Sequence, residues 1–268
     1  MSSSLPLSTL SLRVACAFAM ATTLSACQTS AMNTNSSSTI KPSVTQNKTD
    51  QNKVGQDTPS SDLAMNMSGR HEYQLENGLK IVVKEDHRAP VVMTQIWYRV
   101  GSTDELTDKG GISHLLEHMM FKGTPNVSSD DYERLIAKFG GVNNAFTSYD
   151  YTGYYELFPA NRLPLALELE ADRMKNLTFN DDAFAKEHQV VMEERRQRTD
   201  DNPLAKAYES FRLLALPNSP KGKSIIGPMD EIASITLPDL KNWYETWYAP
   251  NNATLVIVGD VEPNEVLA

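Results

Sequence analysis

Apolar residues are distributed unevenly along the chain, and their spacing divides it into three stretches. One apolar run lies at 14–22, residues 28–67 are rich in Ser, Thr, Asn and Gln, and from residue 68 onwards apolar positions recur at helix and strand spacings. The run at 14–22 is too short to cross a bilayer as a mature helix. We therefore expect a signal peptide at 1–27, a disordered tether at 28–67 and a globular domain at 68–268.

Alternation of apolar and polar residues predicts several strands within this domain. Residues 73–75 and 79–84 flank the sequence Glu-Asn-Gly, which is a strong hairpin signal. Further strands are expected at 91–100, at 142–148 paired with 151–157, and at 253–258.

Helical periodicity and capping residues predict the other elements. The first helix should follow Gly111 and stop near Lys122, with Gly123 in a left-handed cap. Strands and helices in this order, with hairpins, indicate an α+β fold in which helices pack on one face of a mostly antiparallel sheet. The other helices are expected at 130–139, at 163–175, at 180–198, after Asn202-Pro203 and at 237–247.

Charge and cysteine content limit the classes of function. The formal charge is −9, and loss of residues 1–26, in which Arg13 is the only charged side chain, would make it −10. A surface this acidic argues against nucleic-acid binding. Cys16 and Cys27 are the only cysteines, so a chain that begins at Cys27 has no disulfide available.

A processing signal follows the apolar run. Residues 24–27, Leu-Ser-Ala-Cys, resemble the lipobox of bacterial lipoproteins, in which the Cys is lipid-modified and becomes the new N-terminus. Gln28 follows, and not the Asp that often retains such proteins at the inner membrane. The resemblance implies that Cys27 carries a lipid anchor in the outer membrane of a Gram-negative bacterium, with the chain in the periplasm. The alternative is a soluble secreted protein that is cut near Ala26.

The first predicted helix carries two imidazoles and a carboxylate on one face. At about 100° per residue, His118 lies about 40° round from His114, and Glu117 lies about 60° to the other side. Two His at i and i+4 suit a tetrahedral Zn²⁺, and a Glu that does not bind the metal can take a proton from its water. The order His-x-x-Glu-His is that of the inverzincins.

A third ligand is expected from the helix at 180–198, for which Asn180 or Asp181 is the expected cap. Glu187 and Glu194 share its predicted inner side with Val190 and Val191. Glu193 is turned about 100° away and should face solvent. Glu194 is therefore the best candidate for the third ligand, since open zinc sites usually keep three protein ligands. The alternative is that Glu187 and Glu194 are helix-surface acids paired with Arg or Lys.

The two candidate metal-binding segments together resemble those of a known family. His-Leu-Leu-Glu-His at 114–118, followed 76 residues later by Glu194, is similar to the pitrilysin family of zinc peptidases, which includes insulin-degrading enzyme and mitochondrial processing peptidase. The resemblance spans roughly residues 73–261. It implies the α+β fold of one half of such an enzyme.

The resemblance also assigns roles to individual residues. It implies that His114, His118 and Glu194 hold one Zn²⁺ per chain. Glu117 matches the base that activates water, and Glu187 matches a carboxylate that supports catalysis near the metal without clearly binding it.

A strand after the metal helix has an implied role in substrate binding. Asn144, Ala145 and Phe146 match the edge strand on which substrate peptides lie in this family. An extended peptide can add to such an edge through main-chain hydrogen bonds, whatever its sequence. The alternative is that Phe146 packs in the core and Asn144 ends a turn.

The family encloses its substrate between two related halves, and the second half supplies an Arg and Tyr pair. The resemblance therefore implies that this chain is C-terminally incomplete or acts with a second subunit. The expected function is a zinc-dependent endopeptidase of periplasmic peptides or small unfolded proteins. Two alternatives stay open: a non-catalytic binding or scaffolding subunit of a peptidase complex, and an iron site, against which Glu117 argues. The remaining histidines, His71, His87 and His188, are expected at the surface or in hydrogen bonds.

Overall fold

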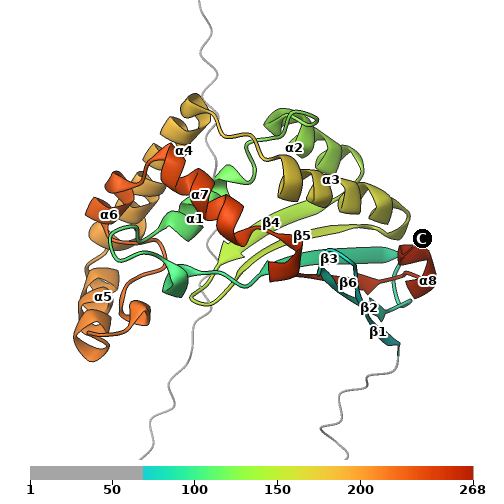
Figure 1. The fold of residues 1–268 in the computed structure, drawn as a ribbon, viewed down its shortest axis with the longest axis horizontal. Helices are drawn as coiled ribbons and strands as arrows, with labels where there is room; N and C mark the ends of the chain where they lie inside the picture. Colours follow the sequence, from blue (N-terminus) through green and yellow to red (C-terminus); the bar gives the residue numbers. More distant parts are fainter. Residues whose placement is uncertain (1–68, 268) are drawn as a thin grey trace, which may run out of the picture. The chain divides into compact units, whose positions relative to one another are not determined.

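The computed structural model of the chain describes residues 69–267 (Figure 1). The predicted signal peptide, the lipobox with Cys27 and the predicted tether lie outside the described residues. None of the helices within residues 69–267 combines the length and the apolar character that a membrane-crossing helix needs.

One sheet is built from β1 (Arg70–Gln74), β2 (Lys80–Glu85), β3 (Val91–Tyr98), β4 (Val142–Thr147), β5 (Thr152–Pro159) and β6 (Ala253–Gly259). The strand order is β1-β2-β6-β3-β5-β4, which makes β4 an edge strand (Figure 1). All neighbours are antiparallel except β2 and β6, which are parallel. The predicted hairpins are confirmed. The parallel pairing was not predicted, because the partner of β6 lies more than half the chain away from it.

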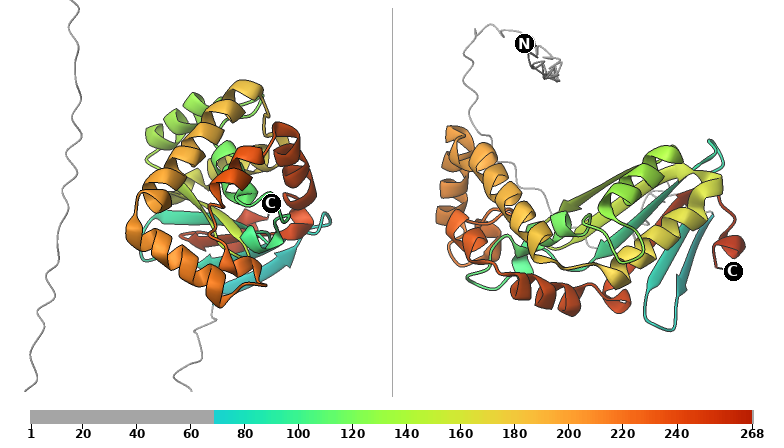
Figure 2. Two further views of the ribbon diagram at one scale, coloured as in Figure 1. Left: turned by 90° about the vertical axis from the view of Figure 1, so that its left-hand side faces the viewer. Right: turned by 90° about the horizontal axis from the view of Figure 1, so that it is seen from above.

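The helices are α1 (Ile112–Met119), α2 (Ser129–Lys138), α3 (Leu163–Asn176), α4 (Asp181–Arg195), α5 (Pro203–Ala215), α6 (Met229–Ser234), α7 (Leu237–Trp247) and α8 (Pro263–Val266). The first three of these lie over one face of the sheet (Figures 1 and 2). The predicted α+β fold with a mostly antiparallel sheet is thereby confirmed.

The core lies between that face of the sheet and the helices. Strand register places Ile81 of β2, Leu255 of β6 and Ile96 of β3 side by side in one buried row. Leu115 and Leu116 of α1 are fully buried above the sheet. Burial of each such side chain contributes about 1.5–3 kcal/mol, so this packing fixes the position of α1.

The end of α1 differs from the prediction. The helix stops at Met119 and does not continue to Lys122. The N–H groups of Phe121 and Lys122 donate to the carbonyls of His118 and Met119, three residues back, so the last turn is tighter than an α-helix. Gly123 has φ +92°, in the left-handed region as predicted.

The end of α4 also differs from the prediction. A regular helix was expected to residue 198, but α4 ends at Arg195 and a π-helix follows at Arg196–Asp200. The N–H of Asp201 donates to the carbonyl of Arg196, five residues back. Asn180 caps the start of α4 by accepting a hydrogen bond from the N–H of Ala183, as expected.

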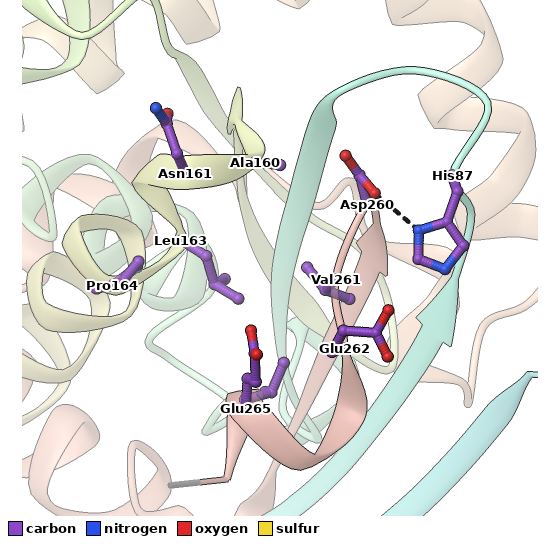
Figure 3. A pocket seen from close by; sticks show the side chains of 10 residues that line it. His87, Ala160, Asn161, Leu163, Pro164, Asp260, Val261, Glu262 and Glu265 are labelled. Carbon is purple, nitrogen blue, oxygen red and sulfur yellow. Dashed lines mark hydrogen bonds and ion pairs between the residues drawn. The ribbon is translucent and has the colours of Figure 1, made fainter.

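The remaining histidines have hydrogen-bond partners. His71 pairs with Glu85, and His188 Nε2 lies 2.7 Å from the carbonyl oxygen of Ile232. His87 lies beyond the end of β2, and its Nδ1 is 2.7 Å from Oδ1 of Asp260, which follows β6 (Figure 3). The Asp260 hydrogen bond raises the pKa of His87, with burial opposing it and the charges of neighbouring carboxylates adding to it.

The His87–Asp260 pair predicts a pH-dependent contribution to stability. Because the pKa of His87 is raised in the folded state, its contribution is complete below the unfolded pKa of about 6.5 and is lost as the pH rises through the folded value. Asp260→Asn should therefore lower the free energy of unfolding more at about pH 5.5 than at about pH 8.5, as measured by urea denaturation. An equal loss at both pH values would contradict this assignment.

Candidate metal centre

The start of α1 depends on a glycine and on a carboxylate from the loop that precedes the helix. Gly111 has φ +93°, and a Cβ atom at this position would lie 2.3 Å from the carbonyl oxygen of Ile226. Glu105 accepts hydrogen bonds from the N–H groups of Gly111 and Ser113, at 2.9 and 3.0 Å, and so caps the helix start. Burial raises the pKa of Glu105 to about 7, while these N–H donors lower it.

Three candidate ligands converge between α1 and α4. Oε2 of Glu194 lies 3.4 Å from Nε2 of His118 and 3.8 Å from Nε2 of His114. One ligand atom from each of the three residues lies within 4.8 Å of the other two. The structure therefore brings together the three residues that the sequence singled out, although 76 positions separate His118 from Glu194.

These three atoms fit a zinc ion. Ligand atoms bound at about 2.0–2.1 Å to a tetrahedral Zn²⁺ are about 3.4 Å apart, which is close to the two distances given above. Two imidazole nitrogens and one carboxylate oxygen are a donor set of the kind that open zinc sites use. Arg198 Nη1 lies 2.8 Å from Oε1 of Glu194, so one carboxylate oxygen is held while the other faces the imidazoles.

The environment favours a neutral imidazole at His114. Burial and, to a smaller extent, the charge of His118 together lower the pKa of His114 to about 4, while the charge of Glu194 opposes this change. Burial also opposes the charged form of His118, but hydrogen bonds with Glu194 and Glu187 raise its pKa. The hydrogen bond with His118 lowers the pKa of Glu194. A neutral imidazole and an ionised carboxylate are the forms that bind a metal.

Glu187 orients His118 and does not belong to the candidate ligand set. Its Oε2 lies 3.2 Å from Nδ1 of His118, on the side of the ring away from Glu194, and its Oε1 lies 2.7 Å from Nζ of Lys122. A carboxylate in this position fixes the tautomer and the orientation of a metal-binding imidazole. By contrast, His114 Nδ1 is buried and has no hydrogen-bond partner within residues 69–267.

The exposure of two side chains of α4 tests the predicted orientation of this helix, and one of the two predictions is wrong. Glu193 faces solvent with 55% of its side chain exposed, as expected. Val190 was expected to face the core with Glu187 and Glu194, but it is 48% exposed. Only Val191 and Arg195 of this helix are buried, and its end at Glu194 borders an open cleft, so Val190 lies outside the core although it shares a side of the helix with the two carboxylates.

This cleft joins the candidate ligands to the edge strand. A cavity of about 570 Å³ is lined by the three ligands, by Glu117 and by residues of β4, including Asn144, Ala145 and Phe146. Asn144 is exposed, and its Oδ1 accepts a hydrogen bond from the N–H of Ala145 at 2.8 Å. Phe146 packs edge-on against Trp97, with ring centroids 5.2 Å apart, and still lines the cavity.

Glu117 faces the same cleft. Thr147 of β4 donates a hydrogen bond from its hydroxyl to Oε2 of Glu117. Burial raises the pKa of Glu117, and the Thr147 hydrogen bond opposes this change. Neither Thr147 nor Glu105 was predicted, because each contacts α1 across a connection whose course no local pattern records.

Comparison with known proteins identifies the family. Residues 80–229 match the family model described as insulinase, peptidase family M16. The chain belongs to peptidase family M16. Residues 234–268 also match the model described as the peptidase M16 inactive domain.

Named relatives of this M16 chain are proteases. It is 40% identical over 199 residues to the zinc protease PqqE of Helicobacter pylori. This alignment covers 74% of this chain and 45% of PqqE. It is 32% identical over 208 residues to the bovine mitochondrial-processing peptidase subunit beta, covering 78% of this chain and 42% of the relative. The chain thus spans less than half the length of these curated relatives.

Solved structures show the same fold. A protease from Helicobacter pylori matches with a TM-score of 0.72 and 38% identity, over 74% of this chain and 48% of that one. The first half of the periplasmic protease PqqL of Escherichia coli matches with a TM-score of 0.68 and 29% identity, over 75% of this chain and 44% of that one.

Gly111→Ala should destabilise the fold by at least about 3 kcal/mol. A left-handed backbone costs an L-residue about 1–2 kcal/mol, and the contact with the Ile226 carbonyl adds to this cost. Gly140→Ala is the matched control, because φ is +71° there but the nearest atom lies 3.9 Å from the added Cβ. Gly140→Ala should lower the free energy of unfolding by about 1–2 kcal/mol. Urea denaturation measures the loss for both variants. Equal losses for the two variants would exclude the steric contribution at Gly111.

Glu187→Gln should weaken zinc binding about tenfold while leaving one site per chain. The variant removes the charge beside Nδ1 of His118, and loss of a carboxylate that orients a metal-binding imidazole costs about 10- to 100-fold in metal affinity. Competition with a chromophoric chelator measures the change. Glu193→Gln, on the exposed side of the same helix, is the control and should bind zinc as the unchanged chain does. Equal affinity in both variants would remove Glu187 from the site.

Proposed function

We propose that this chain is the metal-bearing part of a zinc-dependent endopeptidase that hydrolyses peptides or small unfolded proteins. The observation that carries the proposal is one cleft that contains three converging candidate ligand atoms, a carboxylate outside that set (Glu117) and the edge strand β4. Membership of peptidase family M16 supports it, as do relatives described as zinc proteases.

His114, His118 and Glu194 would hold the zinc ion, which when bound lowers the pKa of a coordinated water and polarises the scissile carbonyl. Glu117 is the proposed base. It lines the same cleft as the ligands but is not part of their cluster, and Thr147 orients its carboxylate. Its role is to accept a proton from water and deliver it to the leaving amine.

The proposed substrate site is the outer edge of β4. Asn144, Ala145 and Phe146 lie beside the metal ligands in the cleft, so a peptide added to this edge would pass the reacting groups. Main-chain hydrogen bonds hold an added strand irrespective of its side chains. This arrangement favours substrates in extended conformation and explains why peptides and unfolded chains, rather than folded proteins, are the proposed substrates.

Activity is proposed to need a second half. The chain spans less than half of its relatives, one of which is described as a subunit, and one solved match is described as the first half of a protease. The second half would be a C-terminal part of the same polypeptide or a second M16-type subunit. Its expected contribution is an Arg and Tyr pair that contacts the substrate.

The proposed location is the periplasm, with the lipid on Cys27 holding the chain at the outer membrane. The lipobox sequence at 24–27 supports this placement. The Escherichia coli protease PqqL, to which the chain is similar, is described as periplasmic. Radiolabelled palmitate incorporation that is lost in Cys27→Ala would test the anchor without depending on enzyme activity.

Glu117→Gln tests the proposed base. The variant should retain one zinc per chain by elemental analysis, because Glu117 is not a ligand, while peptide cleavage with the second half present should fall at least about 100-fold. His118→Ala should lose both zinc and cleavage. Unchanged cleavage by Glu117→Gln would remove the proposed base. Zinc without cleavage in the unaltered chain would favour the binding-subunit alternative, and bound iron would favour a different metalloenzyme.

A further inference from the structure

Arg198 lines the cleft and contacts one of the three candidate ligands. Its Nη1 lies 2.8 Å from Oε1 of Glu194, four residues earlier in the chain. Among the described residues that line the cleft, it is the only arginine or lysine. The other oxygen of the same carboxylate, Oε2, lies 3.4 Å from Nε2 of His118. The two oxygens of Glu194 therefore have different partners, and Arg198 is the partner of the oxygen that does not face the imidazoles.

The backbone that carries Arg198 is held in place. This residue lies in the middle of the π-helix that follows α4. Helix ends usually fray, but here two contacts close the turn. The N–H of Asp201 donates to the carbonyl of Arg196, and Nη2 of Arg195 lies 3.2 Å from Oδ1 of Asp200. Single π-turns next to α-helices are frequent at functional sites.

Arg195, the last residue of α4, anchors this turn to the rest of the domain. Its side chain is buried and donates hydrogen bonds to both carboxylate oxygens of Glu209 on α5, at 2.6 and 2.7 Å. It also donates to the hydroxyl of Ser224 at 3.1 Å. A buried arginine with these partners cannot move without leaving charges unpaired. The position of Arg198 is therefore set by contacts that do not involve the candidate ligands.

Arg196, in the same turn, forms a similar pair away from the cleft. Its Nη1 lies 3.0 Å from Oε2 of Glu193, which is not in the candidate ligand set. Arg198 is 75% exposed, so its pair with Glu194 also has one end in solvent. Exposed ion pairs contribute little to stability. The two pairs differ mainly in what their carboxylates face, which is solvent for Glu193 and the two imidazoles for Glu194.

We propose that Arg198 is a positioning residue of the metal centre, which holds Oε1 of Glu194 so that the carboxylate presents only Oε2 to the ion. A carboxylate without such a partner can turn about its side-chain bonds and can bind a metal through one oxygen or through both. The ion pair removes this freedom before a metal binds. The inference rests on the proposed zinc site and adds to it a residue that is not a ligand.

The charge of Arg198 has an opposite and smaller effect on zinc binding. A cation near Zn²⁺ repels the ion, but the side chain is 75% exposed, so water and salt screen its charge. Its contact is also with the oxygen of Glu194 that does not face the imidazoles. The orientation of Glu194, by contrast, acts through direct contact and is not screened. We therefore expect tighter zinc binding with Arg198 than without it.

Arg198→Gln tests the inference through the zinc affinity of the full chain. Competition with a chromophoric chelator should show binding about tenfold weaker, with one zinc per chain at saturation. Arg198→Lys should restore most of the affinity, because a lysine four residues after a glutamate can make the single contact with Oε1. Arg196→Gln is the matched control in the same turn and should bind zinc as the unchanged chain does. Equal or tighter binding by Arg198→Gln would overturn the inference.

Replacement of zinc by cobalt tests the orientation of Glu194 without any measurement of activity. The visible absorption of Co²⁺ weakens as its coordination number rises. Arg198→Gln should lose part of this absorption, because its Glu194 is free to bind through both oxygens, whereas Arg198→Lys and Arg196→Gln should keep it. A spectrum that Arg198→Gln leaves unchanged would overturn the inference even if the affinity fell.

Two further measurements separate this inference from its alternatives. Urea denaturation without metal should give all three variants the stability of the unchanged chain, because exposed ion pairs contribute little. A loss of stability in Arg198→Gln as large as its loss of zinc affinity would assign the residue a structural role instead. An unaltered chain that binds no zinc would reject the metal centre itself, whereas zinc binding that is insensitive to Arg198 would reject only the inference.

Discussion

The packing of α1 against α4 is the constraint on which the candidate site depends. Two candidate ligands come from α1 and one from α4, and a displacement of about 1 Å would take their atoms out of the range that a tetrahedral ion tolerates. Leu115 and Leu116 are fully buried on one helix, and Val191 is fully buried on the other. The same side chains that form the core therefore set the ligand distances. The three candidate ligands accordingly lie on helices and not on loops.

Much of the fold could be predicted because its signals are local. Alternating strands, the Glu-Asn-Gly hairpin and the Asn180 cap depend on residues within a few positions of one another. The parallel pairing of β2 and β6 could not be predicted, since no short-range pattern records which strand inserts between two others. The early end of α1 was missed for a different reason, because a tightened last turn uses the same residues as a regular one.

The candidate site was predictable to the extent that helical geometry fixes which side chains share a face. His114 and His118 share a face because they are four residues apart, and the same reasoning separated Glu194 from Glu193. It was wrong for Val190, because periodicity identifies a common side of a helix but not what covers that side. It could not find Glu105 or Thr147, which contact α1 from a loop and from an edge strand.

The hydrogen bond between Asn144 and the N–H of Ala145 has a consequence for solubility. An uncovered strand edge invites pairing between copies of a protein, and proteins that keep one open for a ligand risk aggregation. Here the amide oxygen of Asn144 accepts a hydrogen bond from the N–H of Ala145 in β4 at 2.8 Å. This N–H is thereby satisfied without a proline in the strand and without a further strand beside it. An incoming peptide can replace this local hydrogen bond with one of its own. The edge of β4 is therefore less prone to pair with another copy of the protein but stays accessible to a peptide.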